Sequence, residues 1–112
     1  MVEIKYTKDK GRGVFAKQNI ESGTIVFSNH YIAEAIEKVQ NTIFDCYVYD
    51  YGDGNQVVMA LGEGSLINHH QDPNCDFYFD GGLLVFKAIR DISIGEELTI
   101  DYSWKEYPWE KK

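Results

Sequence analysis

The chain has 112 residues and a mass of 12.9 kDa, which fits one domain and excludes an enzyme with separate cofactor and substrate modules. Hydrophobic residues make up 44% of the sequence and aromatic residues 14%, so we expect a globular core rather than disorder. The formal charge of -7 disfavours direct nucleic-acid binding, which needs a basic surface, and suits a cationic partner better.

Short segments rich in Val, Ile, Phe and Tyr recur between turn residues, which is typical of a mostly β domain. In chain order we expect strands at residues 2–6, 13–16, 24–28, 45–51, 76–80, 83–89 and 97–102. Gly81 and Gly82 predict a two-residue hairpin, and residues 53–55 and 92–96 predict further tight turns.

Helix is expected to be scarce. Residues 31–39 place their apolar side chains on one helical face, but the segment is short and uncapped, so helix and strand are equally open there. The segment that begins at Leu61 mixes Gly with apolar residues, and it predicts one short helical turn that leads into an irregular loop.

The two cysteines, Cys46 and Cys75, are too few for a disulfide framework or a four-thiolate zinc site, and we expect both to be small buried hydrophobic residues. No apolar run is long enough to span a bilayer, and the charged N-terminal segment lacks a signal-peptide core. We therefore expect a soluble, intracellular protein, cytoplasmic or nuclear depending on the host, without a membrane, metal or nucleic-acid partner.

The densest group of polar residues is Asn-His-His-Gln-Asp-Pro-Asn at residues 68–74. His69, His70 and Asp72 could indicate a metal-dependent hydrolase. However, adjacent histidines on regular structure point in different directions, and the only other histidine, His30, is distant in sequence. The alternative is a turn braced by Asn and Pro with one buried His.

Two other patterns are less specific when each is taken alone. Gly-Arg-Gly at residues 11–13 precedes a strand, and glycines at this spacing let a backbone approach a ligand closely, although they also mark ordinary turns. The third glycine and the following helix of a dinucleotide-binding unit are missing. Gly-Glu-Glu at residues 95–97 leads into a strand that ends in Tyr102, a residue type more often found in a core or at an edge.

In their order and spacing, G-R-G-V-F-A, G-S-L-I-N-H-x-x-x-P-N and G-E-E-L-x-x-x-Y resemble the SET-domain protein lysine methyltransferases. The resemblance runs from about Lys10 to Tyr102 and is strongest to the minimal SET proteins of viral and bacterial type, to which A-L-G-E-G-S-L-I-N-H from Ala60 is similar. It implies one SET domain over residues 1–112, with a core of about 10–102, small β-sheets, a knot-like C-terminal crossing and little helix. Residues 103–112 would form an aromatic flank without the zinc cluster of many members.

In that family, the methyl group of S-adenosylmethionine moves by in-line displacement to the amine of a protein lysine. The resemblance implies that Tyr102 is the catalytic residue, because its hydroxyl would orient the departing methyl group and the incoming nitrogen. Asn74 would brace the loop that precedes the C-terminal strand. The cofactor would lie against Gly11, Arg12, Gly13, Asn68, His69, Tyr102 and Trp104.

The lysine channel is expected to be aromatic, because π faces stabilise a methylated ammonium. By the same resemblance, the substrate would contact Tyr47, Tyr49, Phe77, Ile100 and Trp109. Apolar residues at Phe77 and Ile100 leave room for further methyl groups and favour di- or trimethylation. Acidic residues near the channel would suit a basic partner such as a histone tail, namely Asp45, Asp50, Asp53 and Glu63.

Two alternatives remain open beside the enzyme. One is a catalytically inactive SET-like module that only holds a lysine-containing peptide or the cofactor, although the retained Asn68, His69 and Tyr102 argue against it. The other concerns assembly: without a zinc-bound flank, the site must be closed by the last ten residues or by a second copy of the chain in a homodimer.

Overall fold

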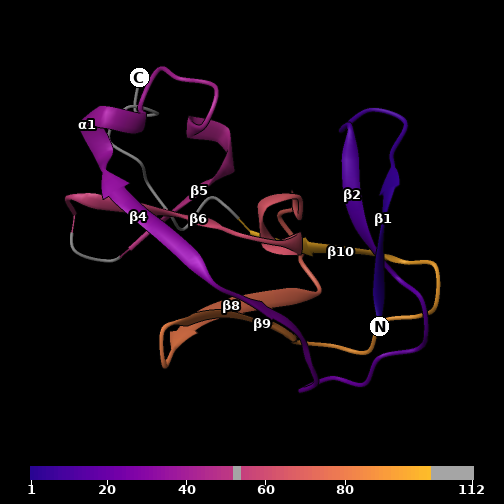
Figure 1. Cartoon of the computed structure of the whole chain (residues 1–112). Helices are drawn as coiled ribbons and strands as arrows, with labels where there is room; N and C mark the ends of the chain where they lie inside the picture. Colours follow the sequence, from indigo (N-terminus) through magenta and orange to yellow (C-terminus); the bar gives the residue numbers. More distant parts are fainter. Residues whose placement is uncertain (52–53, 102–112) are drawn as a thin grey trace.

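The computed structural model describes residues 1–51 and 54–101 and shows a mostly β molecule of three small sheets with little helix (Figure 1), as predicted. The first sheet has the order β1-β2-β10-β7 and consists of β1 (Val2–Tyr6), β2 (Arg12–Ala16), β10 (Glu97–Ile100) and β7 (Asn68–His69). Strand β10 pairs antiparallel with β2 and parallel with β7. This sheet therefore joins parts of all three sequence motifs.

The second sheet has the order β3-β9-β8 and consists of β3 (Ile25–Asn29), β9 (Leu83–Ala88) and β8 (Cys75–Asp80). Strands β8 and β9 form the predicted hairpin, in which Gly81 and Gly82 have φ angles of 57° and 83°. Two consecutive positive φ angles match the twist of the flanking strands, and glycine adopts them without steric cost.

The third sheet has the order β4-β6-β5 and consists of β4 (Tyr31–Ala35), β6 (Gln56–Ala60) and β5 (Val48–Asp50). Strand β4 runs directly into α1 (Ile36–Val39), so the segment at 31–39 holds both of the structures that its sequence left open. Strand β6 was not predicted, although it is the central strand of this sheet. The predicted strand at 45–51 begins instead as a 3-10 turn, η1 (Asp45–Tyr47).

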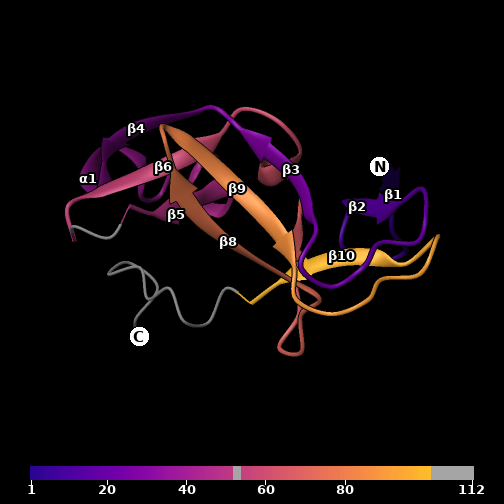
Figure 2. The same ribbon diagram turned by 90° about the horizontal axis from the view of Figure 1, so that it is seen from below.

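The main core is one buried cluster to which all three sheets contribute. Val14, Leu98 and Ile100 from the first sheet pack in one buried cluster with Leu84 and Phe86 of β9. Figure 2 shows β10 passing beside the end of the β8–β9 hairpin. The predicted helical turn after Leu61 is η2 (Glu63–Ser65), and it leads into β7.

The chain from β7 to β8 folds against β10, and the predicted knot-like C-terminal crossing stays a prediction. The backbone N–H of His70 donates to the carbonyl of Ile100 at 3.0 Å, which continues the pairing of β7 with β10. Across the described ranges, no helix is long and apolar enough to cross a membrane.

Candidate active site

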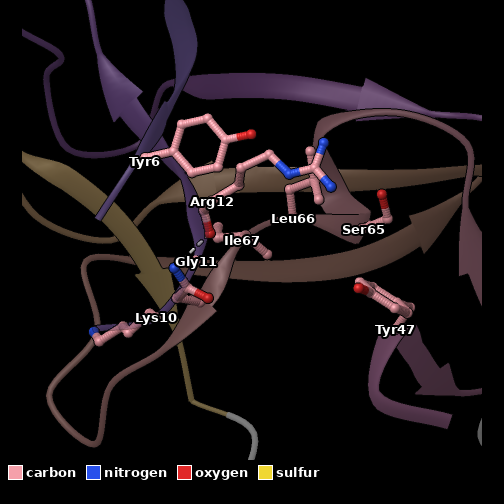
Figure 3. Close-up of a pocket in the computed structure, with 9 residues that line it drawn as sticks. Tyr6, Lys10, Gly11, Arg12, Tyr47, Ser65, Leu66 and Ile67 are labelled. Carbon is pink, nitrogen blue, oxygen red and sulfur yellow. Dashed lines mark hydrogen bonds between the residues drawn. The ribbon is translucent and has the colours of Figure 1, made fainter. Parts of the chain in front are cut away.

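A cleft of about 460 Å³ lies between the β1–β2 hairpin and the segment that leads into β7 (Figure 3). It brings together two motifs that are more than fifty residues apart in sequence. Tyr47 of η1 lies across the cleft from Lys10 and Gly11. The residues that line the cleft are Tyr6, Lys10, Gly11, Arg12, Tyr47, Ser65, Leu66, Ile67 and Asn68.

The two glycines of the first motif serve different purposes. Gly11 has a φ angle of 74°, and a Cβ added there would meet no heavy atom within 4 Å. Its carbonyl accepts hydrogen bonds from the backbone N–H and the Oγ1 of Thr7 at 2.6 and 2.9 Å. Gly13 is buried, and a Cβ there would lie 2.6 Å from Oε2 of Glu97 and 3.0 Å from Nδ2 of Asn68. Gly11 therefore closes the hairpin turn, whereas Gly13 makes room for two protein side chains.

Asn68 connects the first motif to the last one. Its Nδ2 donates to the carbonyl of Arg12 at 3.0 Å and to Oε2 of Glu97 at 2.8 Å. The other carboxylate oxygen, Oε1 of Glu97, lies 3.9 Å from Nζ of Lys10. One amide thus ties β7 to both β2 and β10 at the wall of the cleft.

His69 lies outside the residues that line the cleft, at the C-terminal end of β10. It pairs in register with Ile100, and its Nδ1 is 3.7 Å from Oδ1 of Asp101. Asp101 is the last residue that the structure describes. The predicted catalytic Tyr102 and the predicted cofactor and substrate residues Trp104 and Trp109 lie outside the described residues.

Asn74 holds the loop before β8 against β10. It is 1% exposed, its Nδ2 donates to the carbonyl of Glu97 at 2.8 Å, and its Oδ1 accepts the backbone N–H of Thr99 at 2.9 Å. Nδ2 also lies 3.3 Å from Oε2 of Glu96. One buried side chain thus provides hydrogen-bond partners for two backbone groups of β10, the carbonyl of Glu97 and the N–H of Thr99.

A second asparagine shapes the segment that enters the cleft from η2. Oδ1 of Asn29 accepts the backbone N–H of Gly64 at 2.8 Å, and its Nδ2 donates to Oε1 of Glu63 at 3.0 Å. A Cβ on Gly64 would lie 2.6 Å from the ring of Phe86. Glycine is therefore required there by close packing, and this packing sets the course of the chain towards Asn68.

The predicted lysine-binding residues divide between the cleft and the core. Tyr47 is 42% exposed and lines the cleft, whereas Tyr49, Phe77 and Ile100 are buried. The rings of Tyr49 and Phe77 lie 4.7 Å apart, and the hydroxyl of Tyr49 donates to the carbonyl of Gly64. These three residues thus form the apolar body beneath the site in the described part of the chain.

Sequence reasoning missed Tyr6, Lys10 and Ser65 as lining residues and Glu97 as the partner of Asn68. Tyr6 is 81% exposed and stands in register with Arg12 across the hairpin. A hairpin closed at residues 7–11 would have predicted that pairing. The contact between Asn68 and Glu97 depends on the pairing of β7 with β10 and leaves no local signal in the sequence.

The residues of the metal-dependent alternative do not converge. His70 and Asp72 line a separate cleft of about 230 Å³, where Oδ2 of Asp72 lies 3.4 Å from Nη1 of Arg90, while His69 faces Asp101. Within residues 1–51 and 54–101, no three His, Cys, Asp or Glu side chains are grouped to hold a metal ion.

Cys75 is buried, as predicted, at 1% exposure. Its burial, with a smaller contribution from the carboxylate of Glu96, raises the pKa of the thiol to about 12. A thiol with so high a pKa is a structural residue and not a nucleophile. The side chain of Cys46 lies outside what the structure describes.

Comparison with known proteins decides the family. The SET domain family matches residues 11–103, which is most of the chain and includes Gly11, Arg12 and Asn68 of the cleft. This chain belongs to the SET-domain family. The resemblance stated from the three motifs is thereby confirmed.

Curated relatives of this SET domain are lysine methyltransferases. It is 34% identical to the "Histone-lysine N-methyltransferase, H3 lysine-37 specific" of Schizosaccharomyces pombe, over 90% of this chain and 72% of that protein. It is 34% identical to human "Histone-lysine N-methyltransferase SMYD3" and 33% identical to "N-lysine methyltransferase KMT5A-A" of Danio rerio. It spans only 24% and 38% of those two proteins, which are much longer.

Solved structures confirm the fold. A crystal structure of a Plasmodium falciparum protein assigned as a histone methyltransferase superposes with a TM-score of 0.75 at 23% identity, over 91% of this chain and 96% of that chain. A chain of the ctPRC2 complex superposes equally well, over 91% of this SET domain and 14% of its own length. The mostly β SET fold expected from the sequence is therefore correct.

Proposed function

We propose that this SET domain transfers a methyl group from S-adenosylmethionine to the side-chain amine of a lysine in a protein substrate. The observation that carries the proposal is the cleft in which Gly11, Arg12 and Asn68 meet. Its volume of about 460 Å³ lies within the range of roughly 300–1,000 Å³ that is usual for small-molecule sites. The relatives that carry the family's motifs are named as lysine methyltransferases.

The donors and acceptors of the cleft fit the cofactor. The side chain of Asn68 and the ring of Tyr47 offer partners for a ligand with an amino-acid end and an aromatic base, and Gly11 and Arg12 line the same cleft. In this proposal Gly13, His69 and Trp104 complete the cofactor site. When bound, S-adenosylmethionine supplies a methyl group on a positively charged sulfonium.

The protein's own part in the reaction is mainly alignment. In the proposal, the hydroxyl of Tyr102 orients the lysine nitrogen in line with the methyl group, and such positioning can lower a barrier by several kcal/mol. A lysine amine in an apolar channel beside a positive charge has a lowered pKa, because burial and like charge both disfavour its ammonium form. The amine can therefore lose its proton to water, and no strong base is required.

The proposed substrate is a basic peptide, such as a histone tail, with a lysine. Between residues 18 and 101 the chain has 14 Asp and Glu against three Lys and Arg, and a surface of this sign attracts cationic segments. The apolar residues Phe77 and Ile100 favour di- or trimethylation.

Calorimetric titration with S-adenosylmethionine tests the cofactor site. We expect binding to the unaltered protein and a loss of affinity in Asn68→Ala, with Asn19→Ala, an exposed asparagine outside the cleft, as the control. Absence of binding in the unaltered protein would contradict the proposal. Transfer of a radiolabelled methyl group to lysine peptides then distinguishes an enzyme from an inactive module, which would bind the cofactor without turnover.

A further inference from the structure

A carboxylate stands behind the wall of the cofactor cleft. Glu97 is the first residue of β10 and is half-buried, and it does not line that cleft. Its Oε2 lies 2.8 Å from Nδ2 of Asn68, and its Oε1 lies 3.9 Å from Nζ of Lys10. Glu97 therefore contacts Asn68, which lines the cleft, without lining the cleft itself.

The partners of Asn68 fix which way its carboxamide faces. A primary amide has two N–H protons and one oxygen, and both protons here have acceptors, the carbonyl of Arg12 and the carboxylate of Glu97. Neither acceptor can donate, so a reversed amide would set the Oδ1 of Asn68 against two oxygens. The orientation with Nδ2 towards both acceptors is the stable one.

This orientation leaves Oδ1 of Asn68 for a ligand. In a planar carboxamide the C=O and C–N bonds diverge from the carbonyl carbon, so Oδ1 has another direction than the N–H groups that face Arg12 and Glu97. Oδ1 accepts no hydrogen bond from the residues that the structure describes, and Asn68 lines the cleft. Oδ1 of Asn68 is thus an acceptor for a ligand in the cleft, and a cationic N–H donor suits it.

We propose that Glu97 is a positioning residue, which fixes the carboxamide of Asn68 so that Oδ1 accepts the α-ammonium of the cofactor's amino-acid end. The inference rests on the proposed function and deepens it. Glu97 acts through Asn68 and does not itself touch the cofactor.

The packing around Gly13 supports this role. A Cβ at that position would lie 2.6 Å from Oε2 of Glu97, closer than real Cβ atoms come, and 3.0 Å from Nδ2 of Asn68, which is a tight contact. The second glycine of the first motif therefore leaves space for the pair of Asn68 and Glu97. The three motifs act as one unit: the first makes the space, the second provides the amide and the third orients it.

Two ligands separate a positioning role from a merely structural one. S-adenosylhomocysteine carries the α-ammonium, whereas 5′-methylthioadenosine has the same nucleoside and thioether without the amino-acid end. We expect Glu97→Ala to lower the affinity for S-adenosylhomocysteine about tenfold or more, which is the effect of losing a hydrogen bond to a charged group. The affinity for 5′-methylthioadenosine should change less than about twofold. Calorimetric titration measures both.

Two further variants keep the test decisive even where Glu97→Ala fails to fold. Glu97→Gln keeps the reach and an acceptor oxygen and should retain most of the affinity for S-adenosylhomocysteine. Glu97→Asp keeps the charge but is too short to reach Asn68 and should lose affinity as Ala does. Glu96→Ala, which removes a carboxylate bonded to Ser93 and Asn74 in the same turn, is the control and should leave the ratio of the two affinities unchanged.

The outcomes are distinguishable. If the unaltered protein binds neither nucleoside, the proposed function fails, and this inference fails with it. If the unaltered protein binds both and Glu97→Asp or Glu97→Ala weakens the two equally, or weakens neither, then Glu97 is structural and the inference alone is wrong. Selective loss of S-adenosylhomocysteine in Glu97→Asp, with retention in Glu97→Gln, supports it.

Discussion

At the scale of single residues, asparagines hold the segments around the site together. Asn29, Asn68 and Asn74 each satisfy groups on another part of the chain. A carboxamide can donate and accept at once, so it can bridge two backbones in a buried place without the desolvation cost of a buried charge. The positions of these residues, rather than any metal or disulfide, fix the loops of the described structure.

Replacing Asn74 should therefore be costly. In Asn74→Ala, the N–H of Thr99 and the carbonyl of Glu97 lose their partner at a buried site, so we expect the free energy of unfolding to fall by about 3 kcal/mol. Asn19→Ala is the matched control. It removes an exposed bond from the N–H of Ile94 and should cost about 1 kcal/mol or less. Urea unfolding measures both, and equal losses would show that Asn74 is not a brace.

Cys75 predicts a dependence of stability on alkaline pH. Burial raises the pKa of its thiol to about 12 from a usual value near 9, so the folded state holds this proton more tightly than the unfolded state. The stabilisation is fully present below pH 9 and is lost as the pH rises towards 12, by about 1.4 kcal/mol for each pH unit. Unfolding curves from pH 8 to pH 11 measure it. Cys75→Ala should show a shallower decline, and parallel curves would contradict the assignment.

At the scale of elements, the chain was most predictable where strand and turn signals agree. The β8–β9 hairpin joins two segments rich in apolar and aromatic residues through Gly81 and Gly82, and it forms as expected. Strand β6 is not followed by a two-residue glycine turn. Its adjacent residues Val57 and Val58 are both buried, because it is the central strand of its sheet. It forms a strand because β4 and β5 pair with it on its two sides.

The candidate site was also predictable only in part. The order and spacing of the three motifs indicated the site, and Gly11, Arg12 and Asn68 do line one cleft. The role of Gly13 and the partner of Asn68 were not predictable, because both depend on where β10 lies between β2 and β7. Long-range register carries no local pattern that a single sequence displays.

Substitutions in the β8–β9 hairpin test the assigned turn. A Cβ added at Gly81 or Gly82 would meet no heavy atom within 4 Å, so a substitution there changes backbone strain alone. Because their φ angles are 57° and 83°, we expect Gly82→Val to cost about 1–2 kcal/mol of unfolding free energy. Gly81→Asn should cost only a few tenths, since Asn tolerates this region. Thermal or urea unfolding measures both, and equal costs would exclude the assigned turn.

At the scale of the whole molecule, charge and function are arranged unevenly. Five of the eleven basic residues lie within residues 5–17, in the β1–β2 hairpin that borders the cleft or directly after it. The remainder of the described chain is strongly acidic. The hairpin side thus suits the carboxylate of a cofactor, and the acidic body suits a lysine-rich substrate. Under the proposed function, the charge of -7 would attract a basic substrate.

Mass spectrometry tests the proposed lysine methylation most directly. A basic lysine peptide is incubated with S-adenosylmethionine and either the unaltered protein or Tyr102→Phe. We predict two or three methyl groups on the lysine with the unaltered protein, and little or none with Tyr102→Phe, although that variant still binds the cofactor. Cofactor binding without any methylated lysine, or equal methylation by Tyr102→Phe, would contradict the account.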